Sequence, residues 1–272
     1  MDWIQVLVLS LVQGLTEFLP VSSSAHLILV PELMGWKDQG LAFDIAVHLG
    51  TLIAVLGYFR AELLQMLVGF RQVLKGQLLS FEAKLMCYIA FATLPVGLCG
   101  LLFKNFVATT LRSPLVIAFT TLAFGLLLGV ADRWGRKNRL EQSLNWQDIV
   151  MIGCSQAISL IPGTSRSGIT LSAGLFMGLT REAAARFSFL LSIPVIILAG
   201  GLEAFSLLRA AAPFEWGSLG LGVMLSGLSG YFCIHYFLKL LNKYGLFPFV
   251  LYRLGLGIFL LFTFLPRSGF IT

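Results

Sequence analysis

The chain alternates long apolar runs with short polar segments. A helix needs about 20 mostly apolar residues to cross the hydrocarbon core of a bilayer. Six runs have roughly that length, and they predict six transmembrane helices. Their approximate ranges are 41–59, 85–103, 115–131, 187–206, 218–236 and 246–265.

Two further apolar regions are interrupted in the middle. Residues 3–30 are broken at Pro20 and the serines that follow it, and residues 148–179 are broken at Pro162 and Gly163. Each half is too short to cross a bilayer. Irregular backbone at membrane depth is tolerated where it is buried in protein or lines a wet cavity. We therefore predict two re-entrant helical hairpins.

Composition supports an all-α polytopic membrane protein. Of the 272 residues, 57% are hydrophobic and 12% are charged, whereas soluble domains average about 25% charged residues. The net charge of +6 comes from basic residues scattered in short loops, so it does not indicate nucleic-acid binding. The chain begins Met1-Asp2-Trp3 without a basic n-region, so we expect no cleaved signal peptide. The four cysteines lie in apolar segments, where we expect them to be small buried hydrophobic residues.

Lysine and arginine indicate the orientation of the chain. Cytoplasmic loops of membrane proteins carry an excess of these residues. Most of them lie in four segments, 60–84, 132–147, 181–186 and 237–245, which we place inside. The opposite side keeps Lys37, Lys104, Arg112, Arg209 and Arg267. This assignment puts both termini outside.

The predicted elements also repeat in order. One hairpin and three long helices occupy about 1–131, and a second hairpin with three helices occupies about 148–265, within a single membrane domain, 1–272. Because three spans are an odd number, the second unit must be inverted relative to the first. Inverted repeats with broken helices build binding sites near the midplane of the bilayer. We therefore expect the tips of the two hairpins to meet there.

The two breaks resemble each other in sequence. Pro20–His26 aligns with Pro162–Gly168, and Ser23 then matches Ser165. Ionisable residues inside a membrane are costly, and they indicate a functional site by default. Together the two breaks predict the two halves of a site that handles phosphate.

Arg166 is the strongest candidate for binding an anion. Its guanidinium stays protonated, and its planar fork matches phosphate oxygens in pairs. The alternative is an arginine that pairs with a carboxylate or reaches lipid headgroups, but its place in a hydroxyl-rich break favours anion binding. Neighbouring hydroxyls and amides add neutral donors. The expected substrate contacts are Gly163, Thr164, Ser165, Ser167 and Gly168, with Ser22 and Ser24 from the first break.

The first break supplies groups for chemistry. Gln13 and Glu17 share a helical face, and Glu17 is a candidate cation ligand, general base or partner of His26. His26 is a candidate base, acid or nucleophile. The serines from Ser22 to Ser24 offer a nucleophile, which His26 or Glu17 would activate. Serines at a helix break also satisfy freed backbone groups, and we expect at least one of the three to do only that.

Polar residues in the long helices are weaker candidates. Asp44 and His48 are four residues apart, and they either extend the site or pack the first hairpin in place, which we favour. Arg253 lies in the last helix beside Tyr252, where we expect a structural or headgroup contact.

Two motifs point to a known family. Gln13 to Glu17 forms a Glu/Gln-x-x-x-Glu motif, which Pro-Val-Ser-Ser and His26 follow, and Pro162 to Gly168 reads Pro-Gly-x-Ser-Arg-Ser-Gly. Over nearly its whole length the chain resembles the undecaprenyl-diphosphate phosphatase family, also called bacitracin-resistance proteins. The resemblance implies a hydrolase of the bacterial inner membrane with its site open to the periplasm. It would remove the terminal phosphate of undecaprenyl diphosphate and so recycle the lipid carrier of cell-wall peptidoglycan synthesis.

The resemblance also implies site residues and a cofactor. The catalytic residues that carry over are Glu17, Ser23, His26 and Arg166. The implied cofactor is a divalent cation, Mg²⁺ or Ca²⁺, with Glu17 and Gln13 as ligands. Two positions depart from the family pattern. Gln13 replaces the first acidic residue, so this pair cannot supply two carboxylates, and Ala25 stands where glycine is frequent.

The expected reaction is an in-line displacement at the terminal phosphorus. Ser23 attacks with help from His26 or Glu17, while Arg166 and the cation offset developing charge. Attack by His26 itself, or by a metal-bound water, remains an alternative. A prenyl-phosphate transporter or flippase is the alternative function, since broken helices and inverted repeats are typical of transporters. The implied partners are a polyprenyl diphosphate lipid and the bilayer, without nucleic acid, and a homodimer is left open.

Overall fold

The computed structural model describes residues 1–111, 113–209 and 215–268, and these residues form eleven α-helices, two 3₁₀ turns and no strand. The helices are α1 (Trp3–Thr16), α2 (Ser23–Met34), α3 (Leu41–Tyr58), α4 (Arg60–Leu74), α5 (Phe81–Thr110), α6 (Pro114–Trp134), α7 (Trp146–Ala157), α8 (Arg166–Phe176), α9 (Arg181–Arg209), α10 (Trp216–Tyr244) and α11 (Phe247–Ser268). The 3₁₀ turns are η1 (Glu141–Ser143) and η2 (Ile158–Leu160). Arg112 lies outside the described residues, as do the side chains of Lys104, Arg209 and Arg267.

Helix boundaries follow local side-chain chemistry. The hydroxyl of Ser80 accepts the N–H of Ala83 at the start of α5, and the side chain of Asn145 accepts two backbone N–H groups at the start of α7. Pro114 occupies the first turn of α6, where its missing N–H costs nothing. Gly35 ends α2 in the left-handed conformation that favours glycine.

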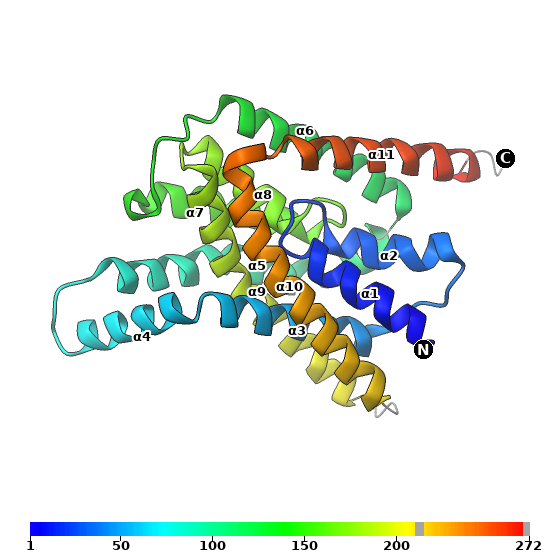
Figure 1. Cartoon of the computed structure of the whole chain (residues 1–272), viewed down its shortest axis with the longest axis horizontal. Helices are drawn as coiled ribbons and strands as arrows, with labels where there is room; N and C mark the ends of the chain where they lie inside the picture. Colours follow the sequence, from blue (N-terminus) through cyan, green and yellow to red (C-terminus); the bar gives the residue numbers. More distant parts are fainter. Residues whose placement is uncertain (112, 210–214, 269–272) are drawn as a thin grey trace.

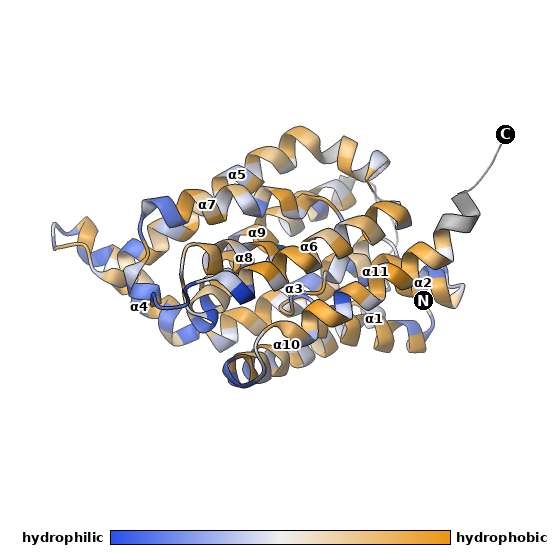
Figure 2. Cartoon of the chain, turned by 90° about the horizontal axis from the view of Figure 1, so that it is seen from above, coloured by the Kyte–Doolittle hydropathy of each residue, from blue (hydrophilic) through white to orange (hydrophobic). Residues whose placement is uncertain are grey.

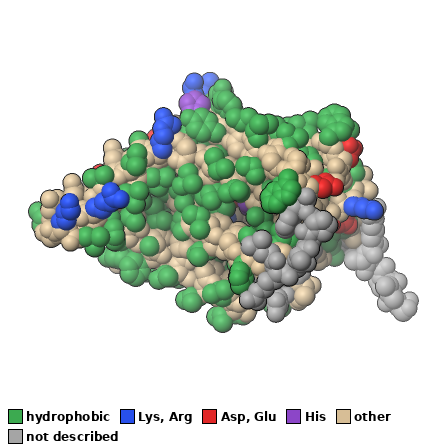
Figure 3. Space-filling view, turned by 90° about the horizontal axis from the view of Figure 1, so that it is seen from below, with side chains coloured by type: hydrophobic (Ala, Val, Ile, Leu, Met, Phe, Trp, Pro, Cys, Tyr) green, Lys and Arg blue, Asp and Glu red, His purple; other side chains and the backbone are tan. Residues whose placement is uncertain are grey.

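The six predicted transmembrane helices are confirmed. α3, α5, α6, α9, α10 and α11 are each long and apolar enough to cross a bilayer. Figure 1 shows that α1 begins and α11 ends at one end of the molecule, whereas α4 lies at the other. Hydrophobic residues run along these helices, and hydrophilic residues gather near α4 (Figure 2). Hydrophobic side chains also cover much of the face seen in Figure 3, with lysine and arginine at its margins.

The polar segments between the helices carry more structure than the sequence predicted. Residues 60–84 were expected to be a loop, but α4 fills most of the segment, because Met66 and Gly69 are buried as α4 packs against α5. α9 begins at Arg181, six residues before the predicted 187, and an ion pair between Arg181 and Asp132 of α6 holds this extra turn.

A cluster of ion pairs joins the segments that we place in the cytoplasm. Arg186 of α9 contacts Glu62 of α4 at 2.9 Å and Glu141 of η1 at 3.6 Å. Burial raises the pKa of Glu141, and the positive charge of Arg186 opposes that shift. Arg139 binds both carboxylate oxygens of Asp148, at 2.8 and 2.7 Å. These contacts bring basic residues of several loops together at one end of the protein.

The two interrupted regions form pairs of short helices, as predicted. α1 and α2 have 14 and 12 residues, and α7 and α8 have 12 and 11, so none reaches the length of a span. α1 packs on α10, and α2 shares an apolar cluster with α6 and α11. α7 packs on α5, and α8 packs on α6. Each hairpin therefore contacts long helices of the other half of the chain, while its depth in the membrane and its inverted orientation stay predictions.

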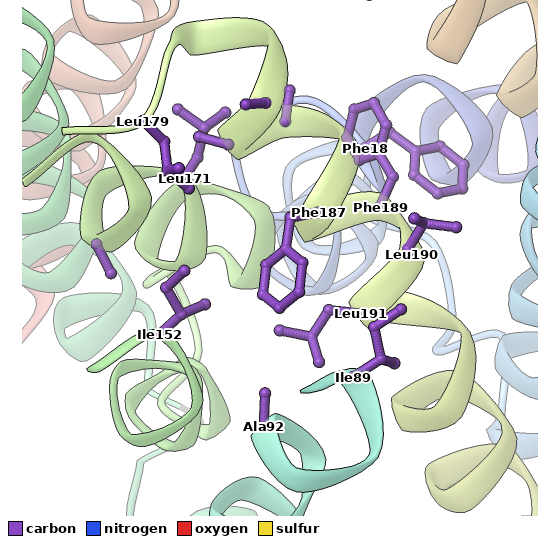
Figure 4. Packing of buried hydrophobic residues seen from close by; sticks show 14 of the residues in the cluster. Phe18, Ile89, Ala92, Ile152, Leu171, Leu179, Phe187, Phe189, Leu190 and Leu191 are labelled. Atoms are coloured by element: carbon purple, nitrogen blue, oxygen red, sulfur yellow. The ribbon is translucent and has the colours of Figure 1, made fainter. Parts of the chain in front are cut away.

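The hydrophobic core lies around α9, in the middle of the molecule. Phe187, Phe189, Leu190 and Leu191 of α9 are buried among side chains of α5, α7 and α8 (Figure 4). Phe18 joins this core from the turn between α1 and α2, and its ring meets that of Phe189 edge to face at 5.4 Å. Phe18 thereby fixes its neighbour Glu17 against the centre of the protein.

Glycines allow the closest helix contacts. A Cβ at Gly50 of α3 would collide with the hydroxyl of Ser226 and the carbonyl of Val223 in α10. Gly14 of α1 meets the same helix, where its Cβ would lie 2.6 Å from the Ser226 carbonyl. Small residues at such positions are the usual way for membrane helices to approach one another.

We predict that Gly50→Ala destabilises the fold by about 1–3 kcal/mol, because one added methyl group overpacks the contact between α3 and α10. Thermal unfolding in detergent would measure the effect. The matched control is Gly57→Ala in the same helix, where a Cβ meets nothing within 4 Å. Equal melting temperatures for the two variants would contradict this account of the packing.

Candidate active site

The turns of the two hairpins begin their second helices in the same unusual way. Ser22 precedes α2 with a φ of 73°, and Ser165 precedes α8 with a φ of 71°. Positive φ is uncommon for residues other than glycine. Such backbone conformations persist when the surrounding structure holds them, and they gather at functional sites. The shared conformation indicates that a functional site lies at these two turns.

The structure corrects the alignment of the two turns by one residue. The hydroxyl of Ser22 lies 3.3 Å from that of Ser24, and the hydroxyl of Ser165 lies 3.2 Å from that of Ser167. Ser22 therefore corresponds to Ser165, and the predicted match of Ser23 with Ser165 is wrong. The sequence alignment matched the two prolines, but equivalent positions in the two turns are defined by where the second helix of each hairpin begins. Ser23 and Arg166 are then equivalent, each as the first residue of its helix.

Glu17 joins these two equivalent residues. The hydroxyl of Ser23 donates to Oε2 of Glu17 at 2.6 Å, and Nη2 of Arg166 donates to Oε1 at 2.8 Å. Nε2 of Gln13 also donates to Oε2, at 3.0 Å. The carboxylate is 8% exposed, so water competes little for these bonds. Three residues that the sequence singled out thus meet at one buried carboxylate.

Arg166 is held on both sides of its guanidinium. While Nη2 binds Glu17, Nη1 donates to the backbone carbonyl of Ser188 in α9 at 3.0 Å. The hydroxyl of Ser188 lies 2.7 Å from that of Thr170 in α8. The sequence left two roles open for Arg166, anion binding and pairing with a carboxylate. In this structure Arg166 pairs with Glu17. An anion at the site would use its remaining N–H groups.

His26 does not pair with Glu17, contrary to one expectation. Its Nδ1 lies 2.7 Å from the backbone carbonyl of Ser22, and its Nε2 lies 2.6 Å from the hydroxyl of Tyr252 in α11. Both ring nitrogens are therefore engaged, and neither faces Ser23. Tyr252 was noted in the sequence only as the neighbour of Arg253, because nothing in the sequence places α11 beside α2.

His48 reaches the site, whereas Asp44 packs the first hairpin. Nε2 of His48 lies 3.8 Å from Oε2 of Glu17, and its Nδ1 bonds the backbone carbonyl of Asp44. The carboxylate of Asp44 accepts from Gln39, whose side chain also donates to the carbonyl of Leu27 in α2. The sequence treated the two residues as one unit, but the structure divides their roles.

Arg253 ties the two turns together. It is fully buried, and it donates to the carbonyl of Pro20 at 3.2 Å in the first turn. In the second turn it donates to Gly163 at 2.8 Å and to Thr164 at 3.0 Å. Further bonds reach the carbonyls of Thr120 and Thr121 in α6. The expected structural role of Arg253 is therefore confirmed. The sequence did not predict that this residue would lie between the two turns.

Several predicted substrate contacts are used inside the protein. The hydroxyl of Ser167 donates to the carbonyl of Leu19, and the N–H of Gly168 donates to the hydroxyl of Ser165. Gly163, with φ +88°, packs against α6, where a Cβ would lie 2.7 Å from the carbonyl of Ile117. Of the other candidates, Ser24 is exposed, whereas the hydroxyl of Thr164 is fully buried and has no hydrogen-bond partner.

The residues around Glu17 fit a hard divalent cation. Oε1 of Gln13 is buried without a partner beside the carboxylate, and the hydroxyl of Ser23 is adjacent. Mg²⁺ is commonly held by one or two carboxylates together with substrate phosphates. Within the described residues no group of three or more His, Cys, Asp or Glu side chains is placed to hold a metal. A cation held by these oxygens would need its other ligands from substrate and water.

Fold and site together define a polytopic membrane protein whose two short hairpins share a buried carboxylate with a half-buried serine and a half-buried arginine. The chain belongs to the bacitracin resistance protein BacA family, whose model matches residues 6–259. It is 56% identical to the undecaprenyl-diphosphatase of Nitrosococcus oceani over 264 residues, 97% of this chain and 100% of that one. It is 57% identical to the undecaprenyl-diphosphatase of Thioalkalivibrio sulfidiphilus over 265 residues, with the same coverage. The family resemblance inferred from the motifs is confirmed.

We predict that Arg253→Gln loosens both turns at once, because one side chain holds carbonyls in each. The free energy of unfolding should fall by about 3 kcal/mol or more, since several buried carbonyls lose a charged donor. Hydrogen exchange followed by mass spectrometry should show faster exchange in peptides covering 17–24 and 161–168. Arg71→Gln, on the exposed side of α4, is the control. Faster exchange in only one turn would contradict the shared tie.

Proposed function

We propose that the chain hydrolyses undecaprenyl diphosphate to undecaprenyl phosphate and phosphate, and so returns the lipid carrier to cell-wall synthesis. The observation that carries the proposal is the hydrogen bond from Ser23 to Glu17, with Arg166 on the other oxygen of the same carboxylate. This arrangement offers a nucleophile (Ser23), a base (Glu17) and a guanidinium that can bind phosphate (Arg166) in one place. The relatives named undecaprenyl-diphosphatase, at 56–57% identity, support the choice of substrate.

The geometry supports Glu17 as the base for Ser23. Glu17 takes the proton of the Ser23 hydroxyl as Oγ bonds to the terminal phosphorus, and the bond from that phosphorus to the bridging oxygen breaks. Undecaprenyl phosphate leaves with the bonding electrons. Water then attacks the phosphoserine, and the proton held by Glu17 returns to Ser23 as phosphate is released. Arg166 offsets the charge on the transferred group, because phosphoryl transfer depends mostly on positioning and electrostatics.

The alternatives from the sequence differ in how well the geometry supports them. Nδ1 of His26 carries its hydrogen toward a carbonyl, and Nε2 is engaged by Tyr252, so His26 is poorly placed as nucleophile or base in this arrangement. A transporter needs an anion site but no serine aligned on a carboxylate, so the contact between Ser23 and Glu17 favours hydrolysis.

A divalent cation, Mg²⁺ or Ca²⁺, is part of the proposal. Glu17 and the amide oxygen of Gln13 would hold it, because both offer oxygen atoms and that of Gln13 is buried without a hydrogen-bond partner. When bound, such a cation neutralises charge on the diphosphate. The protein's own residues hold the serine, its base and the arginine in place.

The proposed location is the bacterial inner membrane, with the site open to the periplasm. The basic segments at the α4 end support a cytoplasmic assignment for that end. The apolar surface of the long helices keeps the prenyl chain of the substrate in lipid while its diphosphate enters between the turns. All the named site groups come from one chain, so the proposed reaction does not require a homodimer.

We predict that detergent-solubilised protein releases phosphate from undecaprenyl diphosphate, and that labelled substrate leaves phosphoserine at position 23. Rapid quenching with acid followed by peptide mass spectrometry would locate the label. Ser23→Ala should abolish the label and lower kcat by at least about 1000-fold. Ser206→Ala, on the exposed side of α9, is the control. Phosphate release without any labelled serine would contradict the covalent route.

We predict that Arg166→Lys lowers kcat/KM by at least about 100-fold while the fold survives. A lysine keeps the charge but cannot hold Glu17 and the Ser188 carbonyl together and still face phosphate oxygens. Steady-state kinetics, with the melting temperature as a check on folding, would measure the effect. Arg71→Lys is the control. Near-normal turnover of Arg166→Lys would mean that the guanidinium has no special part in catalysis.

A further inference from the structure

Tyr252 lies at the outer edge of the site on α11, directly before Arg253. Its side chain is 47% exposed, whereas Arg253 is fully buried. Successive residues of an α-helix point about 100° apart. α11 therefore presents Arg253 to the two turns and Tyr252 to the edge of the site, where its ring stacks on that of His26. Tyr252 takes no part in the proposed reaction.

Hydrogen bonding fixes the state of the His26 ring. The carbonyl of Ser22 can only accept, so Nδ1 of His26, 2.7 Å away, carries the hydrogen. In the neutral imidazole Nε2 is then an acceptor, and the hydroxyl of Tyr252 donates to it at 2.6 Å. The two rings are nearly parallel, with 13° between their planes and 5.8 Å between their centroids. The Ser22 carbonyl thus sets the tautomer of the histidine, and the tyrosine hydroxyl holds the orientation of its ring.

The imidazole in turn holds the strained turn beside the proposed nucleophile. The carbonyl of Ser22 accepts the side chain of His26 and also its backbone N–H, at 3.3 Å. Ser22 has the left-handed φ of 73°, and Ser23 follows it directly. A series of contacts therefore runs from Tyr252 through His26 to the residue before Ser23. Movement of the imidazole would change the direction of the Ser23 hydroxyl.

We propose that Tyr252 is a positioning residue for phosphoryl transfer. Its hydroxyl holds the His26 ring with Nδ1 directed at the Ser22 carbonyl, and His26 so held keeps the turn at Ser22 in the shape that aims Ser23 at the substrate. Tyr252 acts through His26 and need not touch the phosphorus. This inference rests on the proposed hydrolysis of a prenyl diphosphate.

The ring nitrogens of His26 provide a test that does not depend on activity. The chain has only three histidines, so nitrogen-15 spectra of histidine-labelled protein in micelles contain few signals, and His26→Gln identifies the one of interest. We expect a single neutral form with hydrogen on Nδ1 in the wild type. In Tyr252→Phe, which keeps the ring and loses the hydroxyl, we expect Nδ1 to keep its hydrogen toward the Ser22 carbonyl and the Nε2 signal to shift, because Nε2 loses its hydrogen-bond donor. An unchanged His26 signal in Tyr252→Phe would overturn the proposal.

Kinetics give the second part of the test. We expect Tyr252→Phe to lower kcat by about 10-fold, as loss of a partner that orients a histidine commonly does, with KM changed less than about 2-fold. The control is Tyr236→Phe, because Tyr236 is similarly exposed on α10 and its ring lies 5.3 Å from that of His235. Unchanged kcat in Tyr252→Phe, despite an altered His26 signal, would also overturn the positioning role.

The two readouts separate this inference from the proposed function. If the wild type releases no phosphate from undecaprenyl diphosphate, the proposed function fails, and the positioning role fails with it even though the His26 signal shows the predicted tautomer. If the wild type is active and the His26 signal does not respond to Tyr252→Phe, only the inference about Tyr252 fails.

Discussion

The carboxylate of Glu17 is the contact on which the site depends. It receives Ser23 from the first hairpin and Arg166 from the second, so it joins two segments separated by about 150 positions of sequence. A buried carboxylate is costly unless it is paired and hydrogen-bonded, and breaking such a pair typically costs about 3–5 kcal/mol. The same contact therefore stabilises the meeting of the hairpins and brings together the proposed nucleophile, base and phosphate-binding group.

The rest of the fold holds that contact in place. Phe18 packs the turn beside Glu17 against the core around α9, and Arg253 binds carbonyls of both turns. The left-handed conformations of Ser22 and Ser165 are maintained by this surrounding structure, since neither residue would favour them in isolation. The two hairpins supply different groups, one the serine and carboxylate and the other the arginine, so neither forms a site alone.

The sequence predicted the long helices well because crossing a bilayer demands runs of about 20 apolar residues, a strong and local signal. It also singled out Glu17, Ser23 and Arg166, which the structure brings into contact, since polar groups within apolar regions are rarely idle. It did not predict the role of Tyr252 or the division between His48 and Asp44, because these depend on which helices become neighbours. The alignment of the turns was wrong by one residue. Equivalent positions in the two turns are defined by where α2 and α8 begin, and the sequence alone does not locate those helix starts.

In the proposed reaction the terminal phosphate lies between Ser23 and Arg166, with Glu17 as the base. An experimental structure with a non-hydrolysable methylene analogue of undecaprenyl diphosphate would test it most directly. We expect Oγ of Ser23 to lie about 3–3.5 Å from the terminal phosphorus and in line with the bridging group, with Arg166 on the phosphate oxygens. A terminal phosphorus in line with Nε2 of His26, or with a water molecule while Ser23 points away, would contradict it.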